Sequence, residues 1–360
     1  MAFGVYLHIP YCLAKCRYCD FYSKGGSKGV PDEYIQALLL KLRHYMAGQP
    51  RPDTLYFGGG TPSLMSPAQA KLLIAAANPL PGAEITLEAN PETVNEHLLE
   101  GFLAAGVNRL SLGVQTARDD SLARLGRPHT AQVAKEAFAG AKSAGFQNIS
   151  GDIMLALPQY CKAEFDETLD LIQTGGATHI SAYLLKIEPN TAFGKKPPEG
   201  LPDEDEAAGY YLYACEQLEK AGYKKYEISN FARPGFEGRH NLIYWNCGDY
   251  LGLGPAAHSC MQSKRFYWPG STPDFISGKA QPVQDGACGG EDYIILQLRL
   301  TGGLSLPKLK ALYHIELTKK QFQFIERCVQ AGYALFDGET LALTHRGMLI
   351  QNSILCSLLA

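Results

Sequence analysis

The 360-residue sequence has no run of apolar residues long enough to cross a membrane and no excess of positive charge. A membrane-spanning helix needs about 20 mostly apolar residues in a row, and no window approaches that length. Lys and Arg number 33 against 36 Asp and Glu, so the formal net charge is −3, and no basic stripe is visible. We therefore expect neither a membrane-spanning protein nor a nonspecific nucleic-acid binder.

We expect no secretory signal segment, because the first apolar stretch, residues 3–10, is short and ends at a proline. Ten cysteines are present, and seven of them show no repeated spacing: Cys161, Cys215, Cys247, Cys260, Cys288, Cys328 and Cys356. Without a signal segment, such cysteines are expected to be buried and reduced. The expected location is the cytoplasm.

Six short apolar stretches alternate with segments of helical periodicity in the first half of the chain. Strands are expected over 4–10, 54–57, 84–91, 108–115, 148–157 and 179–185, and helices over 32–47, 67–78, 94–105, 131–144 and 161–175. Strands joined by helical crossovers lie parallel, and their apolar character indicates burial on both faces. The pattern predicts an α/β fold with a partial (β/α)6 barrel, whose ligands bind at the carboxyl ends of the strands.

The composition changes after the sixth strand. A loop over 189–202, a helix over 203–221 and a strand over 223–231 are expected, and helices over 293–300, 306–313 and 318–331 precede a hairpin over 333–344 and a helix over 346–359. We expect three parts: a barrel (1–200), an extension of the barrel (201–285) and a C-terminal α+β winged-helix-like domain (286–360). The third of these helices is not notably basic, which favours a structural or partner-docking role over DNA binding.

The motif Cys12-x3-Cys16-x2-Cys19 directly follows the first strand. Crowded thiolates repel one another unless a cation holds them, and soft thiolates favour iron–sulfur clusters, zinc or copper(I). A [4Fe–4S] cluster bound by three cysteines keeps one iron open to another ligand. Structural zinc needs four ligands, and His8 or Asp20 could complete such a site, so zinc remains an alternative.

Glycines and polar residues gather near the ends of the other strands. Gly58-Gly59-Gly60 follows the second strand, and glycine lets the backbone approach a ligand closely. Glu88, Gln115 and Asp152 are expected at the same mouth of the barrel. Taken alone, the two carboxylates equally suit structural ion pairs.

The cysteine spacing after a first strand resembles that of the radical S-adenosylmethionine (radical SAM) superfamily. The resemblance implies that Cys12, Cys16 and Cys19 hold a [4Fe–4S] cluster whose open iron binds S-adenosyl-L-methionine, which reduction cleaves to a 5′-deoxyadenosyl radical. It also assigns a set of residues to the binding of S-adenosyl-L-methionine: Tyr6, Gly59, Gly60, Thr61, Glu88, Gln115, Arg127 and Asp152. Carboxylates suit an ammonium or a ribose diol, and an arginine suits a carboxylate.

Six further stretches resemble the oxygen-independent coproporphyrinogen III oxidases: 8–12, 58–63, 88–91, 111–115, 125–129 and 152–158. Phe21 stands where those oxidases carry a further cysteine, and their long N-terminal arm is not seen. With these two differences and the motif His240-Asn241-x-x-Tyr244-Trp245, the sequence resembles the HemW-type haem-chaperone branch. That branch implies binding of haem b and its delivery to apo-haemoproteins such as respiratory enzymes, with no catalytic residue. The alternative is oxidative decarboxylation of coproporphyrinogen III to protoporphyrinogen IX, a step of porphyrin biosynthesis.

His240 is the expected haem contact, because a neutral imidazole can be an axial ligand of iron. Tyr244 and Trp245 could stack on the macrocycle, although such residues are more often part of the core. Other candidate histidines are His8, His129, His179 and His258. The resemblance further implies a haem donor similar to bacterioferritin, a peripheral membrane contact and a haem-linked homodimer.

Overall fold

The computed structural model describes residues 2–359, in which most strands belong to one 12-stranded sheet. Across that sheet the strand order is β12-β11-β10-β9-β1-β2-β3-β4-β5-β6-β8-β7. The strands of the first half are β1 (Phe3–Ile9), β2 (Thr54–Gly59), β3 (Glu84–Ala89), β4 (Arg109–Gln115), β5 (Asn148–Leu155) and β6 (His179–Leu184). Those that follow are β7 (Lys224–Lys225), β8 (Asn230–Ala232), β9 (Asp249–Leu253), β10 (His258–Met261), β11 (Lys264–Tyr267) and β12 (Val283–Ala287).

Helices join these strands and build the C-terminal part. Up to residue 276 they are α1 (Asp32–Met46), α2 (Pro67–Ala77), α3 (Glu96–Ala105), α4 (Asp119–Leu125), α5 (Ala131–Ser143), α6 (Lys162–Thr174), α7 (Ala192–Lys195), α8 (Glu204–Lys220), α9 (Arg239–Trp245) and α10 (Thr272–Ile276). Beyond it they are α11 (Gly290–Gln297), α12 (Leu306–Tyr313), α13 (Lys319–Gln330), α14 (His345–Leu349) and α15 (Gln351–Leu359). Short 3-10 turns lie at Pro62–Leu64 and Pro91–Thr93.

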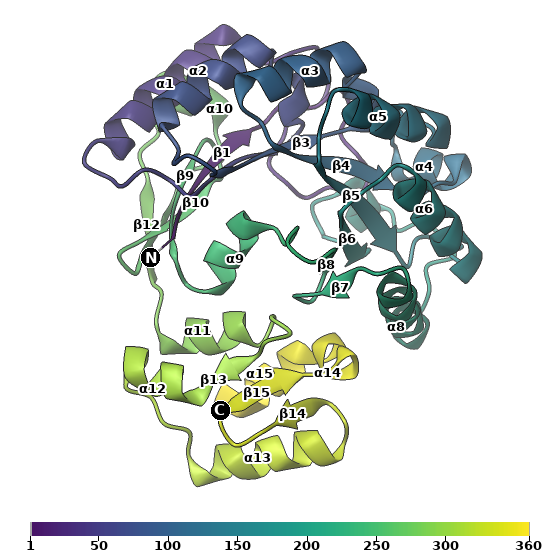
Figure 1. Cartoon of the computed structure of the whole chain (residues 1–360), viewed down its shortest axis with the longest axis vertical. Coiled ribbons are helices and arrows are strands. Elements are labelled where there is room, and N and C mark those ends of the chain that lie inside the picture. The colour runs from purple at the N-terminus through teal and green to yellow at the C-terminus, as the bar shows by residue number, and fades with distance from the viewer. Residues whose placement is uncertain (1, 360) are drawn as a thin grey trace.

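Strands β1 to β6 pair in sequence order and all in parallel, as the alternation of strands and helices predicts. The sheet curves into an open arc, helices α1 to α6 cover its convex side, and α9 lies on the concave side (Figure 1). The predicted α/β fold with a partial (β/α)6 barrel is therefore confirmed. All six carboxyl ends meet at one mouth, because parallel strands point the same way.

The sequence analysis missed the extension of the sheet beyond β1. Strand β9 pairs in parallel with β1, and β10, β11 and β12 follow in antiparallel order. These strands are short and partly exposed, and two glycines interrupt them, so they lack the apolar run that marks β1 to β6. The strand expected over 223–231 is likewise wrong in detail, because a turn divides it into β7 and β8.

Three helices followed by a hairpin form the C-terminal part, as expected of a winged-helix-like unit. Strands β14 (Ala334–Phe336) and β15 (Thr340–Leu343) form the hairpin, and β13 (Leu304–Ser305) pairs with β15. A separate cluster of buried apolar side chains, drawn from residues 293–358, fills this unit. The single helix expected over 346–359 is in fact two helices, which separate at Ile350. The proposed boundaries at residues 200 and 285 stay a prediction, since the sheet itself contains strands from both sides of residue 200.

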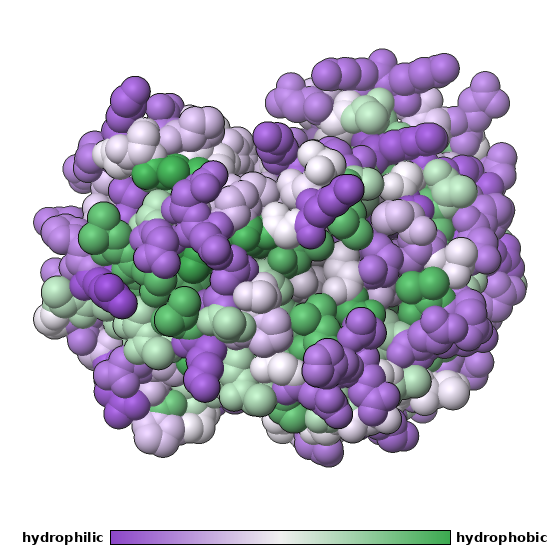
Figure 2. Space-filling model, turned by 90° about the horizontal axis from the view of Figure 1, so that it is seen from above, coloured by the Kyte–Doolittle hydropathy of each residue, from purple (hydrophilic) through white to green (hydrophobic). Residues whose placement is uncertain are grey.

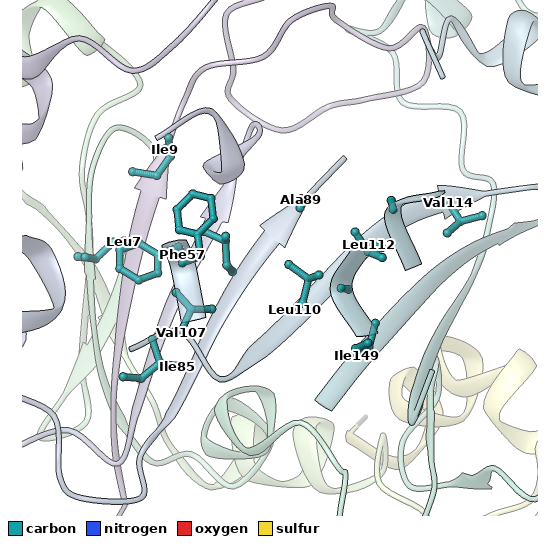
Figure 3. Packing of buried hydrophobic residues seen from close by; sticks show 14 of the residues in the cluster. Leu7, Ile9, Phe57, Ile85, Ala89, Val107, Leu110, Leu112, Val114 and Ile149 are labelled. Carbon is teal, nitrogen blue, oxygen red and sulfur yellow. The ribbon is translucent and has the colours of Figure 1, made fainter. Parts of the chain in front are cut away.

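The main core lies between the sheet and its outer helices. Leu7, Phe57, Leu110 and Leu112 are fully buried on neighbouring strands, and their side chains pack along the arc of the sheet (Figure 3). Seen from above, polar side chains dominate the surface and apolar ones form separate small groups (Figure 2). Among residues 2–359, no helix combines the length and the apolar character needed to cross a membrane.

Leu110 offers a direct test of this core, because its side chain is 0% exposed on the central strand β4. Leu110→Ala should lower the free energy of unfolding by about 2–5 kcal/mol, since truncation removes buried apolar area and leaves a cavity. Leu72→Ala is the matched control, because Leu72 is 50% exposed on α2. Urea denaturation of both variants should show a large loss only for Leu110→Ala, and equal losses would contradict this account of the core.

Candidate functional site

The three cysteines of the motif lie in the loop between β1 and α1, at the mouth of the barrel. Backbone hydrogen bonds close this cysteine loop (residues 10–27): Cys12 donates to the carbonyl of Lys24 at 2.9 Å, and Lys24 donates to that of Pro10 at 2.8 Å. Farther along, Arg17 donates to the carbonyl of Leu125 at 3.0 Å. Cys12 is buried, whereas Cys16 and Cys19 are partly exposed. The loop is therefore fixed at both ends, and its thiols face the cavity.

His8 fastens the cysteine loop to β1. Its Nε2 lies 2.8 Å from the carbonyl oxygen of Tyr22, and its Nδ1 lies 3.0 Å from the hydroxyl of Tyr6. A carbonyl only accepts, so Nε2 carries the proton and Nδ1 accepts from Tyr6. Burial lowers the pKa of His8 to about 4, so the ring stays neutral. Both nitrogens are used in this clamp, and neither faces a metal ion.

The glycine loop after β2 lies directly against the cysteine loop. Gly60 donates to the carbonyl of Ile9 at 2.9 Å, and Thr61 donates to that of Tyr11 at 2.8 Å. A Cβ at position 60 would stand 2.7 Å from the carbonyl oxygen of Tyr11 and 2.9 Å from the Sγ of Cys12. Only glycine fits this position, because backbone atoms and a thiol cannot move aside cheaply.

The cysteine loop, the glycine loop and the ends of β3 to β6 enclose a cavity of about 510 Å³. It is lined by most of the predicted site residues: Cys12, Cys16, Cys19, Gly59, Gly60, Thr61, Glu88, Gln115, Arg127 and Asp152. Phe21, which is 71% exposed, also lines it. Residues from six segments that are far apart in sequence thus share one cavity. Tyr6 and His240 do not line it.

Glu88 is the most perturbed acid of this cavity. Its carboxylate accepts from the hydroxyl of Tyr56 at 2.8 Å and from the amide of Gly59 at 3.1 Å. Burial raises the pKa of Glu88 to about 7, although both hydrogen bonds oppose the shift. A carboxyl group with this pKa changes its charge near neutral pH, so a cation in the cavity would favour its ionised form.

Asp152 is the second buried acid. Burial raises the pKa of Asp152, while hydrogen bonds from Ser181 and Ser111 and the charge of Arg109 oppose that shift. The hydroxyl of Ser111 lies 3.2 Å from its carboxylate. The charge of Asp152 also raises the pKa of Glu88, since two like charges share one enclosed space. No direct ion pair of Glu88 or Asp152 occurs in residues 2–359, so neither acid matches the structural ion-pair alternative.

Arg127 connects three strand ends to the cysteine loop. Its Nη1 donates to the Oδ1 of Asn90 at 2.9 Å and lies 3.7 Å from the Sγ of Cys16, while its Nη2 donates to the carbonyl of Gly113 at 2.9 Å. Asn90 in turn donates to the hydroxyl of Thr61 at 3.1 Å. The Nε of Arg127 is buried and has no hydrogen-bond partner among residues 2–359. The guanidinium of Arg127 places a positive charge beside the thiols.

Gln115 ends β4 in an uncommon backbone conformation. Its φ is +70°, a left-handed value that costs a residue with a side chain on the order of 1 kcal/mol, and the register of β4 against β5 shifts between Leu112 and Gln115. The irregularity turns Gln115 toward the cavity that it lines. Tyr6 lies deeper in the barrel, stacked on Tyr56 with ring centres 6.0 Å apart, and is linked to the site through Tyr56 and His8.

His240 lies on α9 inside the arc and is 2% exposed. Its Nδ1 is 2.7 Å from the hydroxyl of Thr54, its Nε2 is 2.6 Å from that of Tyr244, and its ring stacks on Tyr56 at 5.0 Å. Burial lowers the pKa of His240 to about 3. A haem iron could bind this ring only after one of the two hydroxyls has left.

The remaining candidate histidines divide into two groups. His129 contacts Glu92 and the carbonyl of Val114, and His179 contacts Ser150 and Tyr226, so both nitrogens of each ring are occupied. His258 differs, because its side chain is 54% exposed and its nearest carboxylate, that of Asp285, is 3.9 Å away.

The donor set fits the cofactors that the sequence predicts. Three thiols line one cavity with an unpaired arginine Nε, two carboxylates and a glycine that has no room for a Cβ. Each thiolate of a cube binds its own iron, so such thiols surround a volume and do not meet at one point. Within residues 2–359, no three His, Cys, Asp or Glu side chains are arranged around a single metal ion, as tetrahedral zinc would require.

Two residues of this network were not predicted as site residues. Asn90 links Thr61 to Arg127, and Tyr56 holds Glu88. Both are reached by hydrogen bonds between neighbouring strands, which no local spacing reveals. Two signals pointed to Asn90: its position directly after β3, and its place in the stretch 88–91 that resembles the oxidases.

Comparison with known sequences links the chain to one superfamily and one group of relatives. Residues 6–172 match the radical SAM superfamily. Proteins named heme chaperone HemW are similar over nearly the whole length: the Mycobacterium tuberculosis protein is 34% identical, covering 99% of this chain and 95% of its own. The Bacillus subtilis protein is 33% identical, covering 98% and 97%. The Escherichia coli protein is 44% identical over 71% of this chain and 69% of its own.

Among solved structures, the coproporphyrinogen III oxidase HemN of Escherichia coli, a radical SAM enzyme, superposes with a TM-score of 0.85. The alignment covers 99% of this chain and 90% of HemN at 20% sequence identity. At that identity, the similarity shows that the two chains share a fold.

Gly60→Ala tests the contact between the two loops. The added Cβ would collide with Tyr11 and Cys12, so the cysteine loop must move, and the iron retained after anaerobic reconstitution and desalting should fall to the background level. Gly209→Ala is the control, because a Cβ there meets no atom within 4 Å and alanine favours the helix α8 by about 1 kcal/mol. Equal iron contents in the two variants would show that the loop contact is not required.

Glu88 predicts a pH dependence of stability. Its pKa of about 7 in the folded protein lies above its ordinary value of 4.5, so the folded state holds this proton more tightly than the unfolded chain. The resulting stabilisation is complete below about pH 4.5 and is lost as the pH rises through about 7. The stability of the wild type relative to Glu88→Gln should therefore fall over this range, by up to about 3 kcal/mol. Denaturant titrations at a series of pH values measure it, and parallel curves would contradict the shift.

Proposed function

This chain belongs to the HemW family of the radical SAM superfamily, and we propose on that basis that it is a haem chaperone. It binds haem b and delivers it to apo-haemoproteins such as respiratory enzymes. The observation that carries the proposal is the 34% identity to a heme chaperone over 99% of the chain. Phe21, which stands in place of the further cysteine expected of the oxidases, supports the same choice.

Cys12, Cys16 and Cys19 are proposed to hold a [4Fe–4S] cluster at the mouth of the barrel. When bound, such a cluster supplies an open iron and a source of one electron. The chain contributes the enclosure of the cluster. The glycine loop sets how closely the backbone approaches Cys12, and Arg127 lies against the thiol of Cys16, where its positive charge offsets the negative charge of a thiolate.

S-adenosyl-L-methionine is proposed to occupy the cavity beside the cysteines. Its ammonium and ribose hydroxyls suit Glu88 and Asp152, and its carboxylate suits the guanidinium of Arg127. The positive charge of the ligand would lower the pKa of Glu88 and stabilise both buried acids in their ionised forms. Gly59, Gly60 and Thr61 would meet the ligand through the backbone of the glycine loop, and Gln115 would meet it from the end of β4.

His240 stays the proposed haem contact, but its surroundings add a condition. Coordination through Nε2 requires the hydroxyl of Tyr244 to move away, which shifts α9 or rotates the tyrosine ring. Coordination through Nδ1 requires the hydrogen bond between Nδ1 and the hydroxyl of Thr54 to break. Haem binding at this motif therefore needs a rearrangement of the concave side of the barrel.

A paired assay on anaerobically reconstituted protein tests the function. Titration with haem should give stable binding of about one haem per chain that survives gel filtration, and the haem should pass to an apo-haemoprotein and restore its spectrum. The same preparation should form no protoporphyrinogen IX from coproporphyrinogen III. Failure to bind haem both with and without the cluster would contradict the chaperone proposal. Decarboxylation of coproporphyrinogen III would establish the oxidase alternative.

Two variants separate ligation by His240 from a structural role. Tyr244→Phe releases Nε2, so haem should bind at least as tightly as in the wild type, whereas His240→Ala should change the Soret band and weaken binding. If His240 only supports the fold, both variants should lower the melting temperature and leave the spectrum of bound haem unchanged.

A further inference from the structure

Three of the seven cysteines that looked unrelated in the sequence come together in the fold. Cys247 follows α9, Cys260 lies in β10 and Cys288 follows β12. All three line a second cavity of about 340 Å³, which shares no lining residue with the first. The thiol of Cys288 is in hydrogen-bonding reach of those of Cys247 and Cys260. The expectation that these cysteines are buried is wrong for Cys247 and Cys288, which are partly exposed.

The backbone around the thiols shows how they are brought together. Antiparallel pairing sets Cys260 opposite Arg265, and Cys288 donates its amide to the carbonyl of Ser263 at 2.8 Å. Cys247 has a φ of +51°, in the left-handed region that favours glycine. Strained residues of this kind concentrate at functional sites, where the surrounding structure holds them in place.

The charges near the cluster favour a thiolate at Cys288. Hydrogen bonds from Cys247 and Cys260 lower the pKa of Cys288, and the nearby Arg265 lowers it further, against the effect of burial. The same contacts raise the pKa values of Cys247 and Cys260. Asp292 also lines the cavity, pairs with Arg265 at 3.5 Å and raises the pKa of Cys247. These contacts favour the thiolate, the nucleophilic form, at Cys288 and the protonated form at Cys247 and Cys260.

A redox reaction suits this arrangement better than metal binding. The guanidinium of Arg265 lines the same cavity and already places a positive charge beside the thiols. Cys247 and Cys288 are partly exposed, whereas Cys260 is buried within β10. A small oxidant can reach the first two, and the loop position of Cys247 lets its sulfur move.

We propose that Cys247, Cys260 and Cys288 form a redox-active thiol site, in which Cys288 reacts with a low-molecular-weight disulfide and Cys247 completes a disulfide bond. The thiolate of Cys288 attacks one sulfur of the reagent, its S–S bond breaks, and one reagent thiolate leaves. The thiol of Cys247 then loses its proton and attacks the sulfur of Cys288, which releases the second reagent thiol. Two protein thiols are oxidised, and one small disulfide is reduced to two thiols.

The bond would join two parts of the fold. Cys247 lies two residues after α9 inside the barrel, and Cys288 lies two residues before α11, the first helix of the C-terminal unit. Tyr313 of that unit also lies in hydrogen-bonding reach of Cys247. Oxidation would therefore fasten the C-terminal unit to the end of α9. The inference depends only on these thiols and not on the proposed haem function.

Peptide mapping of the full-length protein tests the site. Reduced protein is incubated anaerobically with oxidised glutathione, free thiols are blocked with iodoacetamide, and non-reducing digests are analysed by mass spectrometry. A peptide pair linked through Cys247 and Cys288 is expected. Cys247→Ser should instead accumulate glutathione on Cys288, and Cys288→Ser should abolish both products. Cys356→Ser is the matched control, because Cys356 is exposed and lies outside the cavity, and it should leave the link unchanged.

A kinetic measurement on the wild type covers the case in which a serine variant fails to fold. In brief alkylation at pH 6.5, Cys288 should react at least about tenfold faster than Cys356, since reactivity follows the thiolate fraction. Arg265→Gln should reduce that ratio several-fold. Faster labelling of Cys356, a link that never includes Cys288, or a stoichiometric zinc ion that protects the three thiols would overturn the proposal.

Discussion

The candidate site depends on one close approach of backbone to backbone. Strand β1 pairs with β2 so that Ile9 lies opposite Gly59. Beyond the ends of the strands, backbone hydrogen bonds from Gly60 and Thr61 continue this pairing. This continuation holds Cys12 against the glycine loop, where a side chain at position 60 would not fit. The glycine loop therefore sets the position of the first thiol, and the clamp formed by His8 sets that of the loop behind it.

The parts of the fold that the sequence predicts are those with a strong local signal. Each of β1 to β6 combines an apolar run with a helical crossover, and such a unit can assemble in few ways. The local sequence pattern predicts less where a strand forms mainly because it pairs with a neighbouring strand. Strands β9 to β12 contain Gly252, Asp285 and Gly286, and they exist because β1 offers an unpaired edge. The C-terminal helices separate at Ile350 for a similar reason, since each packs on a different neighbour.

The same distinction applies to the site. Residues in the carboxyl-terminal half of a strand, such as Glu88 and Asp152, can be assigned to the mouth from position alone, because parallel carboxyl ends converge. Asn90 and Tyr56 act through hydrogen bonds to other strands, and their roles appear only in three dimensions. His240 is the opposite case. Its motif is conspicuous in the sequence, but only the structure reveals that two hydroxyl groups and the ring of Tyr56 surround its side chain.

Helix α9 must be held in place and yet be able to move. Its first amides are held by Glu84, which accepts from Arg239 and His240 at 3.0 Å each, so the start of the helix is fixed to β3. Its end leads within two residues into the strained Cys247 and the second cavity. Its end is held as well, because Gln297 of α11 donates to the carbonyl of Trp245 at 2.9 Å and to the Oδ1 of Asn246 at 3.1 Å. Binding of a ligand through the Nε2 of His240 requires Tyr244, near this end, to move away, so these contacts with α11 oppose access to the ring. A bond between Cys247 and Cys288 would therefore add a covalent link at the end of α9 that has to move.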